Sequence, residues 1–317
     1  MSRLVSYSDV MRLIPERPPL LMIDRLELDT EAQRAQGVKA VSMDEHFFQG
    51  HFPETPIMPG VLQVAAMLQL GGVLIRVLDG EREGLMTRVK TMTRVKFRKP
   101  VLPGDLMMVH AEIKERTAAG TFLVRGETQV AGATTCEGNL EIELITPDAA
   151  CPAPAQLAPP MRPLPDLGPD AETFDVLGVM ATIPHRFPFL LVDRVLTMDR
   201  ARTRVSAIKN VTGNEPLFAG VPIPVFPEYT QVEAAAQAAC AVALKMPGNQ
   251  GKIGFFMSID EAKFLQPVVP GDQLLFELNC VDRGRFGLVD GALYVGEKMV
   301  TQLALKFAIV PRAPAAP

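Results

Sequence analysis

A histidine in a turn rich in glycine and proline is the first residue of this chain whose type and position could do chemistry. His51 lies in the stretch FFQGHFPETPIMPG (residues 47–60), whose glycines and prolines cannot continue a helix or a central strand. From Val61 to Ile75 no residue is charged, which predicts a helix buried inside a domain. His51 would therefore stand just ahead of a helix N-terminus, where free N–H groups and the helix dipole can hold a developing negative charge.

An altered copy of this stretch recurs in the second half of the chain as LFAGVPIPVFPEYTQVEAAAQ, residues 217–237. The copy has Val221 after its glycine, where the first half has His51. On the helix the copy has Glu233, where the first half has Ala65. One half therefore has a histidine without a carboxylate and the other half has the reverse, which is the main clue to function.

The likeness between the halves extends beyond this stretch. The run IPERPPLLMIDR (residues 14–25) returns as IPHRFPFLLVDR (183–194), and KFRKPVLPGD (96–105) returns as KFLQPVVPGD (263–272). The two copies of each motif are about 168 residues apart, so one domain is duplicated. Between the copies, the proline-rich stretch PDAACPAPAQLAPPMRPLPDLGP cannot form regular structure and favours an extended tether. We expect a first domain at 1–146, a linker at 147–169, a second domain at 170–311 and a tail at 312–317.

The order of predicted elements indicates an α+β fold. Each copy has strand-like runs, then one long helix, then a further run of strands, which is typical of an antiparallel sheet that covers a helix. In the first copy these strands are expected at Leu20–Leu26 and Gly37–Ser42, then near residues 85–97, 106–115, 122–130 and 136–145.

Composition limits the function classes. The chain has 317 residues, 48% of them hydrophobic, which is enough for two globular domains. A net charge of −4 argues against nucleic-acid binding by the molecule as a whole. The four cysteines lack CxxC spacing and nearby histidines, so neither a disulfide framework nor a metal site is expected. No secretory segment is evident, and the apolar helix is too short and too rich in Gly and Gln for a confident membrane span. We expect a cytoplasmic protein.

Four motifs that recur in order carry a specific resemblance. The segments PHRFPFLLVDR, GHFPETPIMPG, QVEAAAQ and KFxxPVxPGD resemble those of 3-hydroxyacyl-[acyl-carrier-protein] dehydratases, the FabZ-type hotdog enzymes. The resemblance implies two tandem hotdog domains, each an antiparallel sheet wrapped around a long central helix, that pair as an intramolecular pseudo-dimer. In that family each active site lies at the pairing interface and takes its histidine from one domain and its glutamate from the other.

Carried over to this chain, the resemblance assigns His51 and Glu233 to one intact composite site, whereas the opposite site, with Val221 and Ala65, has neither group. The reaction would remove water from a 3-hydroxyacyl thioester without a cofactor. A histidine with a pKa near neutrality suits removal of the C2 proton, and a carboxyl kept protonated by apolar surroundings suits protonation of the hydroxyl. The N–H of Gly60 would stabilise charge on the thioester oxygen.

Two further residues near this site have open roles. Gln237, one helical turn beyond Glu233, could hydrogen-bond the carboxylate, although Gln69 holds the equivalent place beside Ala65. His185 is the rival histidine; its first-half counterpart is Glu16, and we expect a structural role for it.

Alternating basic residues precede the KFRKP motif. On a strand, residues at even positions share a face, so they would form one basic stripe that docks an acidic acyl carrier protein. The stripe comprises Arg88, Lys90, Arg94, Lys96 and Arg98.

Two other function classes remain open: a non-catalytic acyl-binding or scaffold protein, and a hydratase or thioesterase that acts on CoA esters. By analogy with related dehydratases, three copies of the chain would assemble as a trimer of pseudo-dimers.

Overall fold

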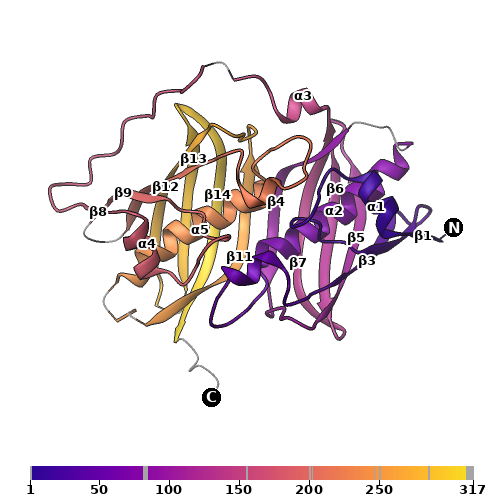
Figure 1. Ribbon diagram of the computed structural model, residues 1–317, viewed down its shortest axis with the longest axis horizontal. Helices are drawn as coiled ribbons and strands as arrows, with labels where there is room; N and C mark the ends of the chain where they lie inside the picture. Colours follow the sequence, from indigo (N-terminus) through magenta and orange to yellow (C-terminus); the bar gives the residue numbers. More distant parts are fainter. Residues whose placement is uncertain are drawn as a thin grey trace.

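A computed structural model describes residues 2–80, 85–154, 156–199, 201, 203–246, 248–249, 251–284 and 286–311. Within these residues, fourteen strands form one continuous antiparallel sheet in the order β1-β2-β3-β5-β6-β7-β4-β11-β14-β13-β12-β10-β9-β8. Figure 1 shows the two halves of the chain side by side, with the long helices α2 and α5 in front of the sheet. The predicted α+β pseudo-dimer of two hotdog domains is confirmed.

Both halves contain the same sequence of elements. The first half contains β1 (Ser2–Val5), α1 (Tyr7–Leu13), β2 (Arg25–Asp29), β3 (Arg34–Ala40), η1 (His46–Gln49), α2 (Gly60–Leu78), β4 (Met86–Phe97), β5 (Leu106–Arg116), β6 (Phe122–Val130) and β7 (Ala133–Ile145). The linker begins with α3 (Pro147–Ala150). The second half contains β8 (Glu172–Phe174), α4 (Val176–Thr182), β9 (Arg194–Met198), β10 (Arg204–Asn210), η2 (Pro216–Phe218), α5 (Glu228–Leu244), β11 (Lys252–Phe264), β12 (Gln273–Asp282), β13 (Gly287–Val295) and β14 (Lys298–Pro311).

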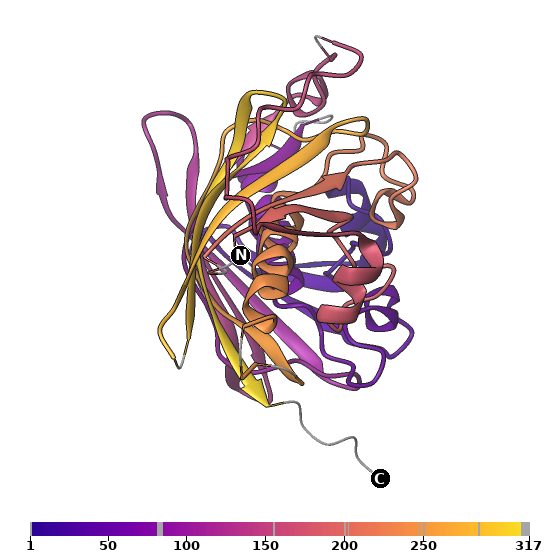
Figure 2. The same ribbon diagram turned by 90° about the vertical axis from the view of Figure 1, so that its left-hand side faces the viewer.

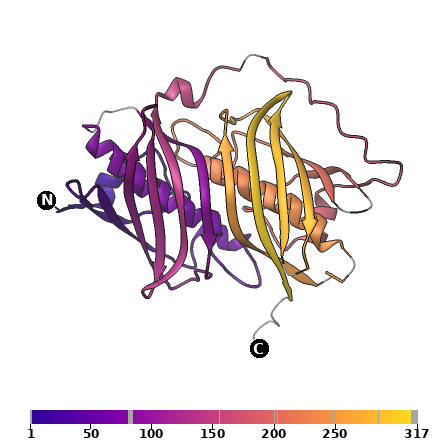
Figure 3. The ribbon, with the colours of Figure 1, turned by 180° about the vertical axis from the view of Figure 1, so that it is seen from behind.

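The halves join through the central strands β4 and β11. These strands pair antiparallel, with Val95 opposite Ile259 and Thr91 opposite Lys263, so the sheet continues from one half into the other. Figure 2 shows that the sheet curves around α2 and α5, which lie on its concave side, and Figure 3 shows its other face from behind. The interface between the halves therefore places the starts of the two helices within reach of loops from the opposite half.

Helix α2 is the apolar core helix of the first half. By length and composition it could cross a membrane, but 89% of its most apolar window is buried inside the fold. Its side chains pack against β3, β5, β6 and β7. Burial of this kind is what a central hotdog helix needs, because apolar area removed from water is the main favourable term in folding.

The strand predicted at Leu20–Leu26 is wrong over most of its length, since β2 begins only at Arg25. The backbone of the preceding segment is instead bound to the side chain of Gln69 on α2. Gln69 Oε1 accepts from the N–H of Met22 at 2.7 Å, and Gln69 Nε2 donates to the carbonyl of Leu20 at 2.7 Å. A buried amide thus takes the place of a neighbouring strand.

The linker runs around the outside of the second half, from α3 to β8, rather than through the core (Figure 1). The expectation that its prolines exclude regular structure fails at its start, because Pro147 occupies the first turn of α3, where a missing N–H costs nothing. Farther along, Arg162 lies over the ring of Tyr294 and its Nε is 3.3 Å from Glu277 Oε1. These contacts hold the linker against the outer face of the second half.

Candidate active site

His51 lies in the loop between η1 and α2, at the interface between the halves. Its Nδ1 is 2.7 Å from the carbonyl oxygen of Ile57. Because a carbonyl can only accept, Nδ1 carries the hydrogen and Nε2 presents a lone pair. Desolvation of the ring, together with the nearby His185, lowers the pKa of His51 to about 4. The imidazole is therefore neutral near pH 7 and able to accept a proton at Nε2.

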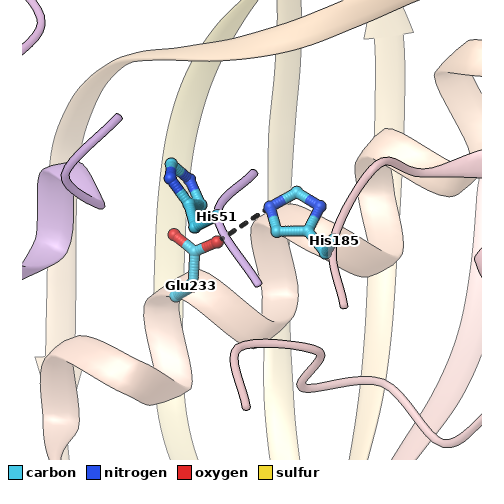
Figure 4. A group of neighbouring side chains, drawn as sticks. All are labelled: His51, His185 and Glu233. Atoms are coloured by element: carbon cyan, nitrogen blue, oxygen red, sulfur yellow. Dashed lines mark ion pairs between the residues drawn. The ribbon is translucent and has the colours of Figure 1, made fainter. Parts of the chain in front are cut away.

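Glu233 lies on the second turn of α5 and comes from the other half. Its carboxylate lies beside both His51 and His185, as Figure 4 shows. Burial raises the pKa of Glu233, but hydrogen bonds from His185 and Gln237 and the nearby histidine rings more than offset it, so the net pKa lies below the usual value. The expectation that apolar surroundings keep this carboxyl protonated is therefore wrong: Glu233 is ionised near pH 7.

His185 belongs to the same cluster. Its Nε2 is 3.4 Å from Glu233 Oε1, and donor atoms of His51, His185 and Glu233 all lie within 4.8 Å of one another. Three such donor atoms could also ligate a metal ion. Sequence reasoning missed the place of His185, although one signal was available. This position also differs between the halves, with Glu16 as its counterpart.

Gln237 connects the carboxylate to the segment that carries His185. Its Nε2 donates to Glu233 Oε1 at 2.9 Å and to the carbonyl of Phe189 at 2.9 Å, while its Oε1 accepts from the N–H of Leu191 at 2.8 Å. Gln69 makes the two corresponding backbone bonds in the first half, where Ala65 stands at the position of Glu233. The glutamine thus anchors this segment to the helix in both halves, and in the second half it also contacts Glu233.

The cluster opens into a cleft of about 490 Å³, which is within the range of small-molecule sites. Gly60, the first residue of α2, lines this cleft. A β-carbon at Gly60 would approach the Phe97 ring to 2.9 Å, so only glycine fits without displacing the ring. The remaining lining is largely apolar and comes from both halves: Phe52, Ile57, Met58, Gln63, Arg98, Lys99, Pro100, Ala236, Cys240, Gly254, Phe255, Phe256, Met257, Phe307 and Val310.

The opposite side of the interface has a pocket of only about 70 Å³. Val221 lines it where His51 lines the cleft, and Glu228 stands where the cleft has Gly60. Arg88 enters this pocket, with its Nε 3.9 Å from Glu228 Oε1 and its Nη2 donating to the carbonyl of Phe264. Burial raises the pKa of Glu228 to about 7. The second pocket has therefore lost both candidate catalytic groups and much of its volume.

The position of Arg88 contradicts the predicted single basic stripe. Strand β4 has register shifts between Val89 and Thr91 and between Thr93 and Lys96, and Arg94 has a positive φ of 53°. Such bulges break strict alternation, and Arg88 and Lys90 both lie near Glu143 while Arg88 also reaches Glu228 in the second pocket. Arg94, Lys96 and Arg98 are exposed, Lys90 is half-buried, and the Arg88 side chain is only 15% exposed.

Comparisons with known proteins identify the family of both halves. The family described as FabA-like domain matches twice, over residues 14–139 and 183–304. The chain belongs to the FabA-like domain family. A 3-hydroxyacyl-[acyl-carrier-protein] dehydratase FabZ of Symbiobacterium thermophilum is 46% identical over 137 residues, which are 42% of this chain and 96% of that protein. The FabZ of Desulforamulus reducens is 44% identical over 138 residues, 43% of this chain and 96% of that protein. Each relative therefore corresponds in length to one half.

Solved structures match the FabA-like chain as a whole. The dehydratase domain of RzxB from Pseudomonas fluorescens has a TM-score of 0.61 at 14% identity and covers 93% of this chain and 99% of its own. The dehydratase domain of the CurJ module of curacin polyketide synthase has a TM-score of 0.60 at 14% identity, with 94% and 97% covered. At this identity the likeness shows the fold alone, which is two hotdog units in one chain.

Proposed function

We propose that this chain dehydrates 3-hydroxyacyl thioesters to trans-2-enoyl thioesters at one composite site, with the acyl group carried on acyl carrier protein. The observation that carries the proposal is the meeting of His51 and Glu233, from opposite halves, in one cleft. The FabZ relatives are named for this activity. The four cysteines are free thiols, which fits a reducing cytoplasm.

His51 is the base in this mechanism. Its Nε2 lone pair takes the proton from C2 of the thioester, and the ring becomes an imidazolium. The electrons of the broken C–H bond move onto the thioester carbonyl while the C3–O bond stays intact. They form the C2–C3 double bond in the later step, when the C3 oxygen receives a proton and the C3–O bond breaks. The N–H of Gly60, at the start of α2, stabilises the negative charge that develops on the thioester oxygen.

In this mechanism Glu233 is not protonated at the start of the cycle and receives the proton that it donates during turnover. Because the carboxylate is ionised in the free protein, the proton for the departing hydroxyl has to reach it during turnover. The His51 imidazolium passes the C2 proton to Glu233, which delivers it to the oxygen on C3, and water leaves. One proton is taken and one is returned, so the cluster ends in its starting state. His185 and Gln237 hold the carboxylate for both transfers.

The mouth of the cleft suits an acidic carrier. Arg98 and Lys99 line it and are exposed, whereas their second-half counterparts are Leu265 and Gln266. Arg98 Nε also donates to Glu137 Oε1 at 2.8 Å, so Lys99 has the freer charge of the two. We place carrier docking at Arg94, Lys96, Arg98 and Lys99, and exclude Arg88 from it.

The test is turnover of 3-hydroxyacyl carrier-protein and CoA thioesters by the wild type, His51→Ala and Glu233→Gln, each checked for folding by circular dichroism. We expect both variants to lose activity by about 100-fold or more, as for loss of a general acid or base. Full activity in either variant would refute the composite site. A folded wild type that binds acyl thioesters without converting them would favour the acyl-binding alternative. Release of free thiol would favour a thioesterase.

A further inference from the structure

The cleft continues from the cluster along one face of α5. Glu233, Ala236 and Cys240 line it at spacings of three and four residues, which places them on one side of the helix. At 1.5 Å per residue, Cys240 lies about 10 Å beyond Glu233 along the helix axis. Gly254 on β11 faces Cys240 so closely that a β-carbon there would approach its sulfur to 2.5 Å. The inner part of the cleft is thus a narrow apolar channel between α5 and the sheet.

A second cavity lies farther along the same face of α5. Ala243, the next residue in the series after Ala236 and Cys240, lines it together with Cys280 and Ile309. This cavity is small, about 40 Å³. Its remaining lining includes Met246, Phe286 and Gly287, with the polar residues Asn249, Lys252 and Asp282. One face of α5 therefore lines both the cleft beside the cluster and this second cavity.

Phe307 on β14 lines both cavities. It is buried, with 9% of its surface exposed, and lies opposite Gly287 on β13. A β-carbon at Gly287 would collide with the Phe307 ring, so the ring lies against bare backbone. The phenyl ring therefore borders both spaces, and glycine on the neighbouring strand makes room for it.

We propose that Phe307 sets the acyl chain length that this site accepts, by closing the inner end of the channel. This inference rests on the proposed function. The acyl chain extends past Glu233 along Ala236 and Cys240, and its terminal carbons meet the Phe307 ring. With a smaller side chain the channel would join the second cavity, and each additional methylene would exchange water for apolar contact.

The first half provides a matched control. Phe122 and Ile142 face each other on β6 and β7 as Gly287 and Phe307 do on β13 and β14. Ile142 is fully buried and lies next to Gly71 of α2, on the side of the molecule without the catalytic groups. Truncation of Ile142 therefore removes core volume without changing the channel.

The experiment compares wild type, Phe307→Ala and Ile142→Ala on 3-hydroxyacyl thioesters whose chains lengthen two carbons at a time. For Phe307→Ala we expect the optimum to move to longer chains. For substrates longer than the wild-type optimum, the ratio of kcat/KM in Phe307→Ala to kcat/KM in wild type should rise by about tenfold for each added pair of methylenes. This rise should continue only as far as the joined space accommodates the chain. Ile142→Ala should keep the wild-type profile. Phe307→Leu, a milder truncation, decides the question if Phe307→Ala does not fold.

An unchanged chain-length profile in a folded Phe307→Ala or Phe307→Leu variant would overturn the inference. Turnover of shorter substrates by the same variants would leave the proposed function intact. A wild type inactive at every chain length would instead refute the proposed function and this inference with it.

Discussion

His185 Nε2 lies 3.4 Å from Glu233 Oε1, and both residues come from the second half of the chain. This contact keeps the carboxylate ionised despite its burial, because a donor to the charged form lowers the pKa. His185 also lowers the pKa of His51. One side chain therefore lowers the pKa of both candidate catalytic groups, so we class His185 as a positioning residue.

We predict that His185→Ala moves the acid limb of the pH profile of kcat/KM to higher pH. Without His185, the pKa values of Glu233 and His51 both rise, so the active form with neutral His51 and ionised Glu233 is lost at a higher pH. His185→Gln, which retains a donor, should shift the limb less. Glu16→Ala, at the counterpart position in the opposite pocket, should leave the limb in place. A limb that stays fixed in His185→Ala would show that His185 does not control these two pKa values.

A comparison of Gln237 with Gln69 distinguishes a role in anchoring the backbone from a role in catalysis. Each makes two backbone bonds to the segment before β9 or β2, and only Gln237 also contacts a carboxylate. We predict that Gln237→Ala and Gln69→Ala each lower the free energy of unfolding by about 1–3 kcal/mol, the cost of buried groups left unpaired. Only Gln237→Ala should lower kcat substantially. Denaturant unfolding and turnover of the two variants test this, and equal losses of kcat would show that Gln237 acts through stability alone.

The basic residues at the mouth of the cleft, Arg98 and Lys99, predict an effect on KM that depends on whether the substrate is linked to the carrier protein. Lys99→Glu reverses a charge at the mouth of the cleft, whereas Gln266→Glu makes an acidic group at the counterpart position in the other half. We expect Lys99→Glu to raise KM for the carrier-linked substrate by about tenfold at low salt, with a smaller effect at high salt. Its KM for a short thioester without a carrier should not change. Gln266→Glu should resemble the wild type with both substrates, and a similar KM effect in both variants would argue against docking at this rim.

Much of the site could be predicted because its pattern is local. The duplication, the loop that carries His51 and the uncharged surroundings of Glu233 are all visible in the sequence. A histidine in one half and a carboxylate in the other can form one site only if the two halves pack together. The pairing of β4 with β11 joins the halves.

What could not be predicted depends on contacts between distant segments. The pKa of Glu233 is lowered by His185 and His51, which are both far from it in sequence. The missing strand before Arg25 results from bonds to Gln69, and the broken basic stripe results from bulges beside Arg94. Periodicity assumes regular backbone, so it fails where a buried side chain or a bulge replaces the regular pattern.

Glu228 predicts a pH dependence of stability. Its folded pKa is raised to about 7 from 4.5, so the protonated form is the one that the fold favours. Its contribution to stability is fully present below the unfolded pKa and is lost as the pH rises through about 7. Glu228→Gln removes this loss. We expect the free energy of unfolding of Glu228→Gln, relative to wild type, to rise by about 2 kcal/mol between pH 5 and pH 8. The exposed substitution Glu297→Gln should show no such rise in urea unfolding.

We predict that restoring a carboxylate and a histidine does not make the second pocket catalytically active. Ala65→Glu and Val221→His would return a carboxylate and a histidine, but Glu16 and Glu228 still replace His185 and Gly60, and Arg88 still fills the space. A pocket of about 70 Å³ is also far below the range that holds substrate-sized ligands. We therefore predict that both substitutions, placed in a His51→Ala background, give a folded protein that remains inactive. Adding Glu16→His, Glu228→Gly and Arg88→Phe, the residue at the counterpart position 255, should restore measurable turnover. Activity with the first two substitutions alone would show that the second pocket admits substrate and that the charged residues do not block it.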